Sequence, residues 1–322
     1  MSYRSAVKHR NTKFFEEYKH HFKSQQVDLP RSCITTDGVR KKIVLLCSGE
    51  SALDLTLKQL YWLRDAADAI IAVNKSMIYA NLVGVVPSHL FLMDAHTAES
   101  RYALQRSFDF CFDHQISLYG SILRNKVSNN ITCCPEEFLS SIESCVSVKD
   151  VKSLRDLSSD QLRIYYGSKL GKIKFLAPAS SENYFLNWQP WNDPSNTWSR
   201  SLNRDLFHFR GSFTSLLNYV CIKHPCSDIY AIGADFYGSQ YFFQDEIDSE
   251  LSSCWGDCWT KPLIAKSGLH FSAQSYRGSS MFDQSEYIVQ QLNAFECKLF
   301  SFNSRSLLVT AKMAAPVDSE GG

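Results

Sequence analysis

The stretch SDIYAIGADFY, residues 227–237, decides the fold that this sequence predicts. An apolar strand leads directly into a glycine turn, and the turn presents Asp235 and Tyr237. In an open α/β sheet, ligands bind outside the carboxyl ends of the strands. Polar side chains at such a strand end are therefore candidates for chemistry, although Asp is also common simply as a turn-capping residue.

Three earlier segments repeat this pattern of a short apolar strand followed by a polar residue. They are KKIVLLC at 41–47, AIIAVN at 69–74 and HLFLMD at 89–94, and a helix with leucine spacing over 52–63 separates the first two. Apolar strands joined by helices indicate a parallel sheet with both faces covered. We therefore predict an α/β, Rossmann-like fold with a mostly parallel sheet and helices on both faces. Further helices are expected at 211–220 and 285–295, the latter leading into a strand at 298–303.

The chain is expected to contain one main domain with two additions. We predict an N-terminal helical extension over 1–38, a Rossmann-like domain over 39–305 and a C-terminal tail over 306–322, which is disordered after Lys312. Within the domain, 100–205 is expected to be a variable region on the acceptor side, and 238–268 a mobile lid.

Two aromatic segments leave alternatives open. FFEEYKHHFK, residues 14–23, predicts an amphipathic helix packed on the main body, with a membrane-surface anchor as the alternative. The tryptophan-rich segment 187–198 favours a packed surface loop over a sugar-stacking surface.

Composition excludes several classes of protein. The 322 residues are 44% hydrophobic and 21% charged, which is typical of a folded globular protein. A net charge of +1 provides no strong positive electrostatic field, so no nucleic-acid partner is expected. No apolar run is long enough to cross a bilayer, so any membrane contact is expected to be peripheral.

The eleven cysteines predict free thiols in a reducing cytoplasm, because no signal peptide is evident at the start of the chain. The pairs Cys133–Cys134 and Cys254–Cys258 lack the second ligand pair that a zinc site needs, so no metal site is expected.

Four groups of candidate site residues follow predicted strands: the turn at 47–51, Asn74, Asp94, and Asp235 with Tyr237. Parallel strands end at the same edge of a sheet, where a helix N-terminus attracts phosphate. A nucleotide fits this arrangement, but the first turn, CSGES, is neither GxGxxG nor a Walker loop, which disfavours an oxidoreductase. The residues expected around the nucleotide or donor are Ser48, Gly49, Glu50, Asn74 and Asp94.

Taken in order, these motifs resemble the bacterial sialyltransferases that act on lipooligosaccharides, a Rossmann-like family that uses CMP-activated sialic acid. The block FRGSFTSLLNYVCIKHPCSDIYAIGADFYGSQYFF, residues 209–243, carries the resemblance, together with SGLHFS at 267–272. The likeness covers roughly 41–303 and is weak between 100 and 205. The chain is also similar to the retaining β-Kdo transferases, which use CMP-activated Kdo on related scaffolds.

The resemblance implies roles for individual residues. Tyr237 and Tyr241 would donate to the leaving phosphate, and Arg210 and Ser212 would lie near the donor or its phosphate. In an inverting transfer His270 would be the general base. In a retaining transfer Asp235 would be the nucleophile and His270 would assist the leaving group.

The sequence thus predicts an enzyme, a cytoplasmic glycosyltransferase, with contact to the inner face of the membrane as an option. It would move a 2-keto sugar acid, of the sialic acid or Kdo type, from CMP to a hydroxyl of a cell-surface glycan such as lipopolysaccharide, lipooligosaccharide or capsule. No metal or other cofactor is demanded. A nucleotide-binding protein without turnover is the alternative from a different class, and a zinc hydrolase is a weaker one. The acid sugar, the acceptor, the stereochemistry and the oligomeric state stay open.

Overall fold

The computed structural model describes the chain in segments. They are residues 2–20, 40–92, 110, 114, 118–125, 173–175, 185–188, 195–202, 204–238, 240–255, 268–270, 272–275 and 277–317. Asp94, Cys133, Cys134 and Cys258 lie outside these segments, as does most of the region 100–205.

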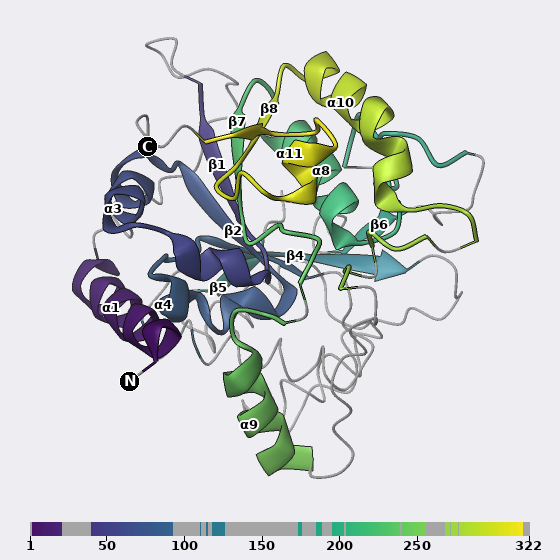
Figure 1. Ribbon diagram of the computed structural model, residues 1–322. Coiled ribbons are helices and arrows are strands. Elements are labelled where there is room, and N and C mark those ends of the chain that lie inside the picture. The colour runs from purple at the N-terminus through teal and green to yellow at the C-terminus, as the bar shows by residue number, and fades with distance from the viewer. Residues whose placement is uncertain are drawn as a thin grey trace, which may run out of the picture.

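One parallel sheet organises the described chain (Figure 1). Its strands follow the order β5-β4-β3-β2-β1-β7-β8-β9, β6 pairs with β4, and every pairing is parallel. The strands are β1 (Lys42–Leu46), β2 (Ala69–Val73), β3 (His89–Leu92), β4 (Leu118–Asn125), β5 (Ile173–Phe175), β6 (Phe185–Trp188), β7 (Asp228–Ile232), β8 (Lys298–Ser301) and β9 (Ala315–Pro316). The predicted α/β fold with a parallel sheet is confirmed.

The order of the strands reverses once, between β1 and β7. From β1 the chain proceeds through β2, β3 and β4 on one side, whereas β7 pairs with the other edge of β1. Such a reversal separates the loops that leave two neighbouring strands and opens a crevice at their carboxyl ends. In this chain, the turn after β1 and the loop after β7 leave the sheet at this position, and backbone hydrogen bonds join them there.

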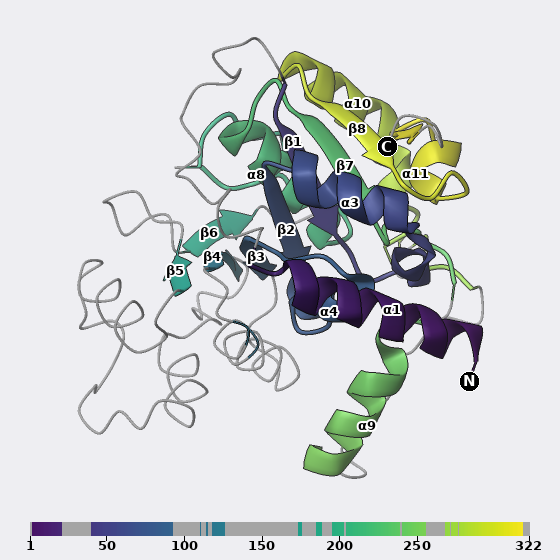
Figure 2. The same ribbon diagram turned by 90° about the vertical axis from the view of Figure 1, so that its left-hand side faces the viewer.

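Helices cover both faces of the sheet (Figures 1 and 2). One face carries α1 (Tyr3–Tyr18), α3 (Leu57–Ala66) and α4 (Ala80–Val83), and the other carries α8 (Ser212–Lys223), α10 (Ser285–Ala294) and α11 (Leu307–Thr310). Short 3-10 turns are η1 (Glu50–Asp54), η2 (Asn74–Met77) and η6 (Met281–Gln284), and α9 (Gln244–Trp255) projects away from the sheet in both views.

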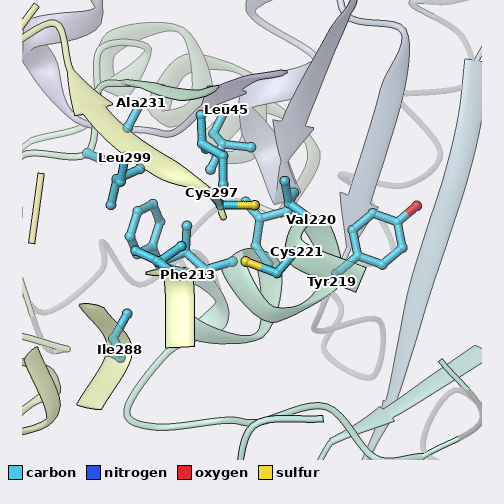
Figure 3. Close-up of a cluster of buried hydrophobic side chains, with 14 of the residues drawn as sticks. Leu45, Phe213, Tyr219, Val220, Cys221, Ala231, Ile288, Cys297 and Leu299 are labelled. Atoms are coloured by element: carbon cyan, nitrogen blue, oxygen red, sulfur yellow. The ribbon is translucent and has the colours of Figure 1, made fainter. Parts of the chain in front are cut away.

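Strand β1 shows why its continuous apolar run predicted a strand of a parallel sheet. Val44 and Leu46 belong to the core under α1 and α3, whereas Ile43 and Leu45 belong to the core under α8 and α10. Successive side chains of a strand point to opposite faces, so a strand covered on both sides is apolar throughout. Figure 3 shows the second of these cores, to which Leu45 contributes together with residues of α8, β7, β8 and α10.

The described cysteines Cys47, Cys221, Cys226 and Cys297 are free thiols, as expected. Cys221 and Cys297 are buried in the core that Figure 3 shows. Among the described segments, no helix is both long and apolar enough to cross a membrane.

The N-terminal helix begins earlier than the aromatic pattern predicted, because Ser2 caps it by accepting from the Ser5 amide. Phe14 and Phe15 are buried against the main body, as the packed alternative expects. These two rings are thus not exposed to a membrane surface.

The predicted C-terminal tail is wrong up to residue 317. The Ser306 hydroxyl accepts from the Leu308 amide to start α11 and donates to the Ala234 carbonyl, while β9 pairs with β8. Leu308 and Met313 are buried in the core. The sequence predicted a disordered tail after Lys312 because the residues that follow, MAAPVDSEGG, are mostly small or polar.

The first part of the predicted lid also differs from the expectation. Phe242, Phe243 and Ile247 are at most 1% exposed and pack in the core under α1. Residues 241–247 therefore hold the loop to the domain, which is not the behaviour of a lid. By contrast, the burial of Trp198 agrees with the packed loop that the sequence favoured for the tryptophan-rich segment.

We predict that Phe15→Ala lowers the free energy of unfolding by about 3–5 kcal/mol, because it opens a cavity beneath α1. Tyr3→Ala on the same helix, where the side chain is 81% exposed, should change it by less than about 0.5 kcal/mol. Urea denaturation measures both. Equal, small effects would contradict the packing of α1 on the domain.

Buried histidines give a second prediction. Burial lowers the pKa of His89 and His208 to about 4 and that of His224 to about 3, from an ordinary 6.5. Below pH 6.5 the unfolded chain binds protons that the folded chain does not. Each such histidine therefore lowers stability by up to about 1.4 kcal/mol per pH unit as the pH falls from 6.5 to 4.

Urea midpoints across pH 4 to 8 measure this slope. His89→Asn should make the slope shallower, whereas His9→Asn, at an exposed position of α1, should leave it unchanged. An equally steep slope in both variants would contradict the assignment.

Candidate functional site

The turn after β1 lies directly on the loop after β7. The Cys47 amide donates to the Ile232 carbonyl at 2.8 Å, and the Gly49 amide donates to the Gly233 carbonyl at 2.7 Å. A Cβ atom on Gly49 would lie 2.4 Å from Asp235 Oδ2 and 2.6 Å from the Gly233 carbonyl oxygen. Only glycine permits this approach, so Gly49 closes the crevice rather than lining an open cavity.

Asp235 is 3% exposed and its carboxylate is held by three donors. The Ser51 amide donates to Oδ2 at 3.0 Å, the Ser51 hydroxyl donates to Oδ1, and the Asn303 side-chain amide donates to Oδ1 at 2.8 Å. A buried carboxylate needs such donors to offset its loss of hydration. The charge is therefore accommodated by neutral groups that follow β1 and β8.

Asn303 links Asp235 to Tyr237. Its Nδ2 atom also donates to the Tyr237 hydroxyl oxygen at 2.7 Å, and its Oδ1 atom accepts from the Arg305 amide at 3.0 Å. Because the Tyr237 oxygen accepts from Asn303, the hydroxyl proton of Tyr237 is directed to another acceptor. With 36% of the residue exposed, that acceptor can be a ligand.

Asn303 and Ser51 were not among the predicted site residues. Asn303 follows an apolar strand in the same way as Asn74, so the same signal was present in the sequence. Its importance comes from the adjacency of β7 and β8, which places it beside Asp235.

Tyr241 lies on the other side of the turn after β1. It forms an antiparallel bridge with Gly49, and the neighbouring Phe242 amide donates to the Ser48 carbonyl at 3.0 Å. The Tyr241 ring stacks on Phe243 with centroids 5.2 Å apart, and burial raises the pKa of its hydroxyl. Tyr237 and Tyr241 thus flank this turn, with Tyr237 bonded toward β8 and Tyr241 facing η2.

The end of β2 contributes Asn74 and Lys75 to the same edge. Asn74 has φ = 51°, a left-handed conformation that asparagine tolerates and that starts η2 at the end of the strand. The Lys75 Nζ atom lies 5.4 Å from the centre of the Tyr241 ring. A cation thereby stands beside one of the two predicted phosphate-binding tyrosines.

Glu50 is engaged by the N-terminal helix. Its Oε1 atom accepts from Arg4 Nη1 at 2.8 Å, in an ion pair of which the Glu50 side chain is 45% exposed. A nucleotide that bound Glu50, as the sequence predicted, would have to compete with this ion pair.

His270 and Arg210 come together on the α8 side of the loop. The His270 amide donates to the Phe236 carbonyl at 3.1 Å, and the two rings meet edge to face. Arg210 donates to the Gln274 carbonyl at 3.3 Å, while the Gln274 amide donates to the His270 carbonyl at 3.2 Å. Ser212 is the first residue of α8, directly after this region.

The protonation of His270 follows from its surroundings. Burial lowers its pKa to about 4, so the ring is neutral at pH 7. The Ser272 amide donates to Nδ1 at 3.3 Å, which assigns the proton of the neutral ring to Nε2. The hydrogen bonds of Asp235 go to Ser51 and Asn303, so the acid and the imidazole do not form a hydrogen-bonded pair.

The charge of Asp235 affects other groups at the site. Burial and then Asp235 raise the pKa of Cys47 to about 12. Burial and then Asp235 also raise the pKa of Asp54 at the end of η1, against the opposing effect of Arg305. Within the described segments, no group of three or more His, Cys, Asp or Glu residues is arranged to hold a metal ion.

Comparisons of this chain with protein-family models, with curated proteins and with solved structures find no match.

We predict that Asn303→Asp makes stability fall as the pH rises. When two carboxylates are in contact, the pKa of one of them rises, so the folded variant holds a proton that the unfolded chain releases above about pH 4. The free energy of unfolding should fall, relative to the wild type, by about 1.4 kcal/mol for each unit by which that pKa rises. Urea denaturation at pH 5 and pH 8 measures it.

Asn293→Asp, at an exposed position of α10, is the matched control and should show no such trend. A pH-independent effect of Asn303→Asp would contradict the contact between Asn303 and Asp235.

Proposed function

We propose that this protein is a glycosyltransferase that moves a 2-keto sugar acid from CMP to a hydroxyl of a cell-surface glycan. The observation that carries the proposal is the bond from Asn303 to the Tyr237 oxygen, which turns the tyrosine into a donor at the strand-order reversal. The motif order that resembles CMP-sugar transferases supports the nature of the donor.

The transfer requires stabilisation of a departing phosphate. The bond between the anomeric carbon and the phosphate oxygen breaks, and CMP leaves with the electron pair. The acceptor oxygen bonds to the anomeric carbon and its proton passes to a base or to water. Tyr237 and Tyr241 donate to the phosphate oxygen as its charge grows, and the Lys75 ammonium beside Tyr241 adds a positive charge.

The surroundings of His270 favour a donor role for it. A ring with a pKa of about 4 is a weak base at pH 7, because a general base works best with a pKa near the working pH. Its Nε2 proton suits a bond to the leaving group or to a sugar oxygen. This agrees with the role that the retaining alternative gives to His270.

Asp235 has a positioning role under either stereochemistry, because it holds Ser51 and Asn303. As the nucleophile of a retaining reaction it would use Oδ2, which accepts one hydrogen bond and is covered by Gly49. Attack through this atom requires the turn after β1 to shift. Product configuration, measured by NMR, separates the two reactions.

The burial of Asp235 favours one second candidate, a nucleotide-binding protein without turnover. CMP binding by calorimetry and CMP release from CMP-sialic acid and CMP-Kdo distinguish the two. Binding with no release from either donor, with and without glycan acceptors, would support the second candidate. Absence of CMP binding would overturn both.

We predict that Tyr237→Phe lowers kcat by about a hundredfold while KM for the donor changes little, because the lost hydrogen bond forms mainly in the transition state. Tyr3→Phe, which alters an exposed tyrosine hydroxyl of α1, is the control and should be normal. Steady-state rates of CMP release measure both, and a normal kcat for Tyr237→Phe would remove its assigned role.

A further inference from the structure

Arg4 of the N-terminal helix connects two loops of the candidate site. Its Nη1 atom donates to Glu50 Oε1 at 2.8 Å, in the turn after β1. Its Nη2 atom donates to the Tyr241 carbonyl at 3.0 Å and to the Phe242 carbonyl at 3.2 Å, in the loop after β7. One guanidinium therefore fastens the loop that carries Tyr241 to the turn that carries Glu50.

The chemistry of this contact requires arginine. The planar guanidinium presents several N–H groups in a fixed fork, so that it can serve a carboxylate and two carbonyls at once. A lysine ammonium is a compact charge on a flexible stem and does not span the same acceptors in the same way. Even the conservative change Arg4→Lys should therefore weaken this contact.

Other contacts, which do not involve Arg4, hold α1 on the domain. One turn further along α1, Lys8 pairs with Glu246 at 2.6 Å, and the lysine is only 9% exposed. Phe14 and Phe15 anchor the other end of the helix in the core. Arg4 is therefore presented from a rigid element, and not from a free chain end.

The loop that Arg4 holds determines where Tyr241 lies. On its inner side the loop is bonded to the turn by the Phe242 amide and the Ser48 carbonyl. On its outer side the Phe242 carbonyl accepts from Arg4, and the Tyr241 carbonyl accepts from Arg4 and from the Gln244 amide at 3.1 Å. Loss of Arg4 removes its two hydrogen bonds to these carbonyls, which tie this loop to α1, while the buried rings of Phe242 and Phe243 keep the segment folded.

We propose that Arg4 is a positioning residue of the candidate site, which acts through the loop of Tyr241 to place this tyrosine for the departing phosphate. The effect on the donor rests on the proposed function, whereas the attachment of the loop by Arg4 does not depend on it. The N-terminal helix is then part of the site and not an accessory extension.

The test compares Arg4→Gln and Arg4→Lys with Lys13→Gln, which removes a charge from an exposed position of the same helix. Hydrogen exchange of the Phe242 amide reports the attachment of the loop, and steady-state kinetics with CMP-sialic acid or CMP-Kdo report KM and kcat. We expect both Arg4 variants to exchange Phe242 about tenfold faster or more and to lower kcat by a similar factor. The change in KM should be smaller, and Lys13→Gln should match the wild type.

The outcomes separate this proposal from the function on which it rests. If the protein neither binds CMP nor uses a CMP-sugar, faster exchange in the Arg4 variants would still support the attachment of the loop by Arg4. The same result would contradict the proposed function. Unchanged exchange, or faster exchange with an unchanged kcat in an active enzyme, would overturn the positioning role. Arg4→Lys keeps the charge, so its exchange rate and kcat decide between these outcomes if Arg4→Gln does not fold.

Discussion

The close approach of Gly49 to Asp235 is the contact on which the rest of the site depends. Because the turn after β1 has no side chain at this position, it lies flat against the loop after β7. That placement lets Ser51 reach the buried carboxylate, and it lets Tyr241 bridge to the same turn from the other side. A carboxylate this deeply buried is tolerated only when donors surround it, and those donors come from the ends of two different strands.

The sequence predicted the central sheet well because of how the sheet is buried. A strand such as β1 is covered on both faces, so its apolar run is continuous and easily recognised. The last elements could not be found in this way. The burial of Leu308 and Met313 results from packing against the finished sheet, and the apolar run 307–309 is too short to indicate that packing. The same holds for Phe242 and Phe243, whose aromatic run resembled a lid but forms core.

The candidate site could be located from the sequence, but its internal connections could not. Asp235 and Tyr237 stand at a strand end, as expected, whereas their shared partner Asn303 becomes visible only when β8 is known to lie beside β7. The sequence also grouped His270 with Asp235. Side-chain direction separates them, because Asp235 is bonded toward β1 and β8 while His270 packs on the ring of Phe236.

The distribution of charge indicates where an anionic donor would lie. Burial and then the charge of Asp235 raise the pKa of Cys47 and of Asp54, so the surroundings of Asp235 resist further negative charge. On the opposite side of the turn after β1, the Lys75 ammonium stands at the ring of Tyr241. A phosphate is stabilised by cations and by hydroxyl donors, and repelled by a carboxylate. The phosphate of the proposed donor would therefore lie between the two tyrosines on the Lys75 side, and Asp235 would act on it through the hydroxyl that Asn303 orients and not by direct contact.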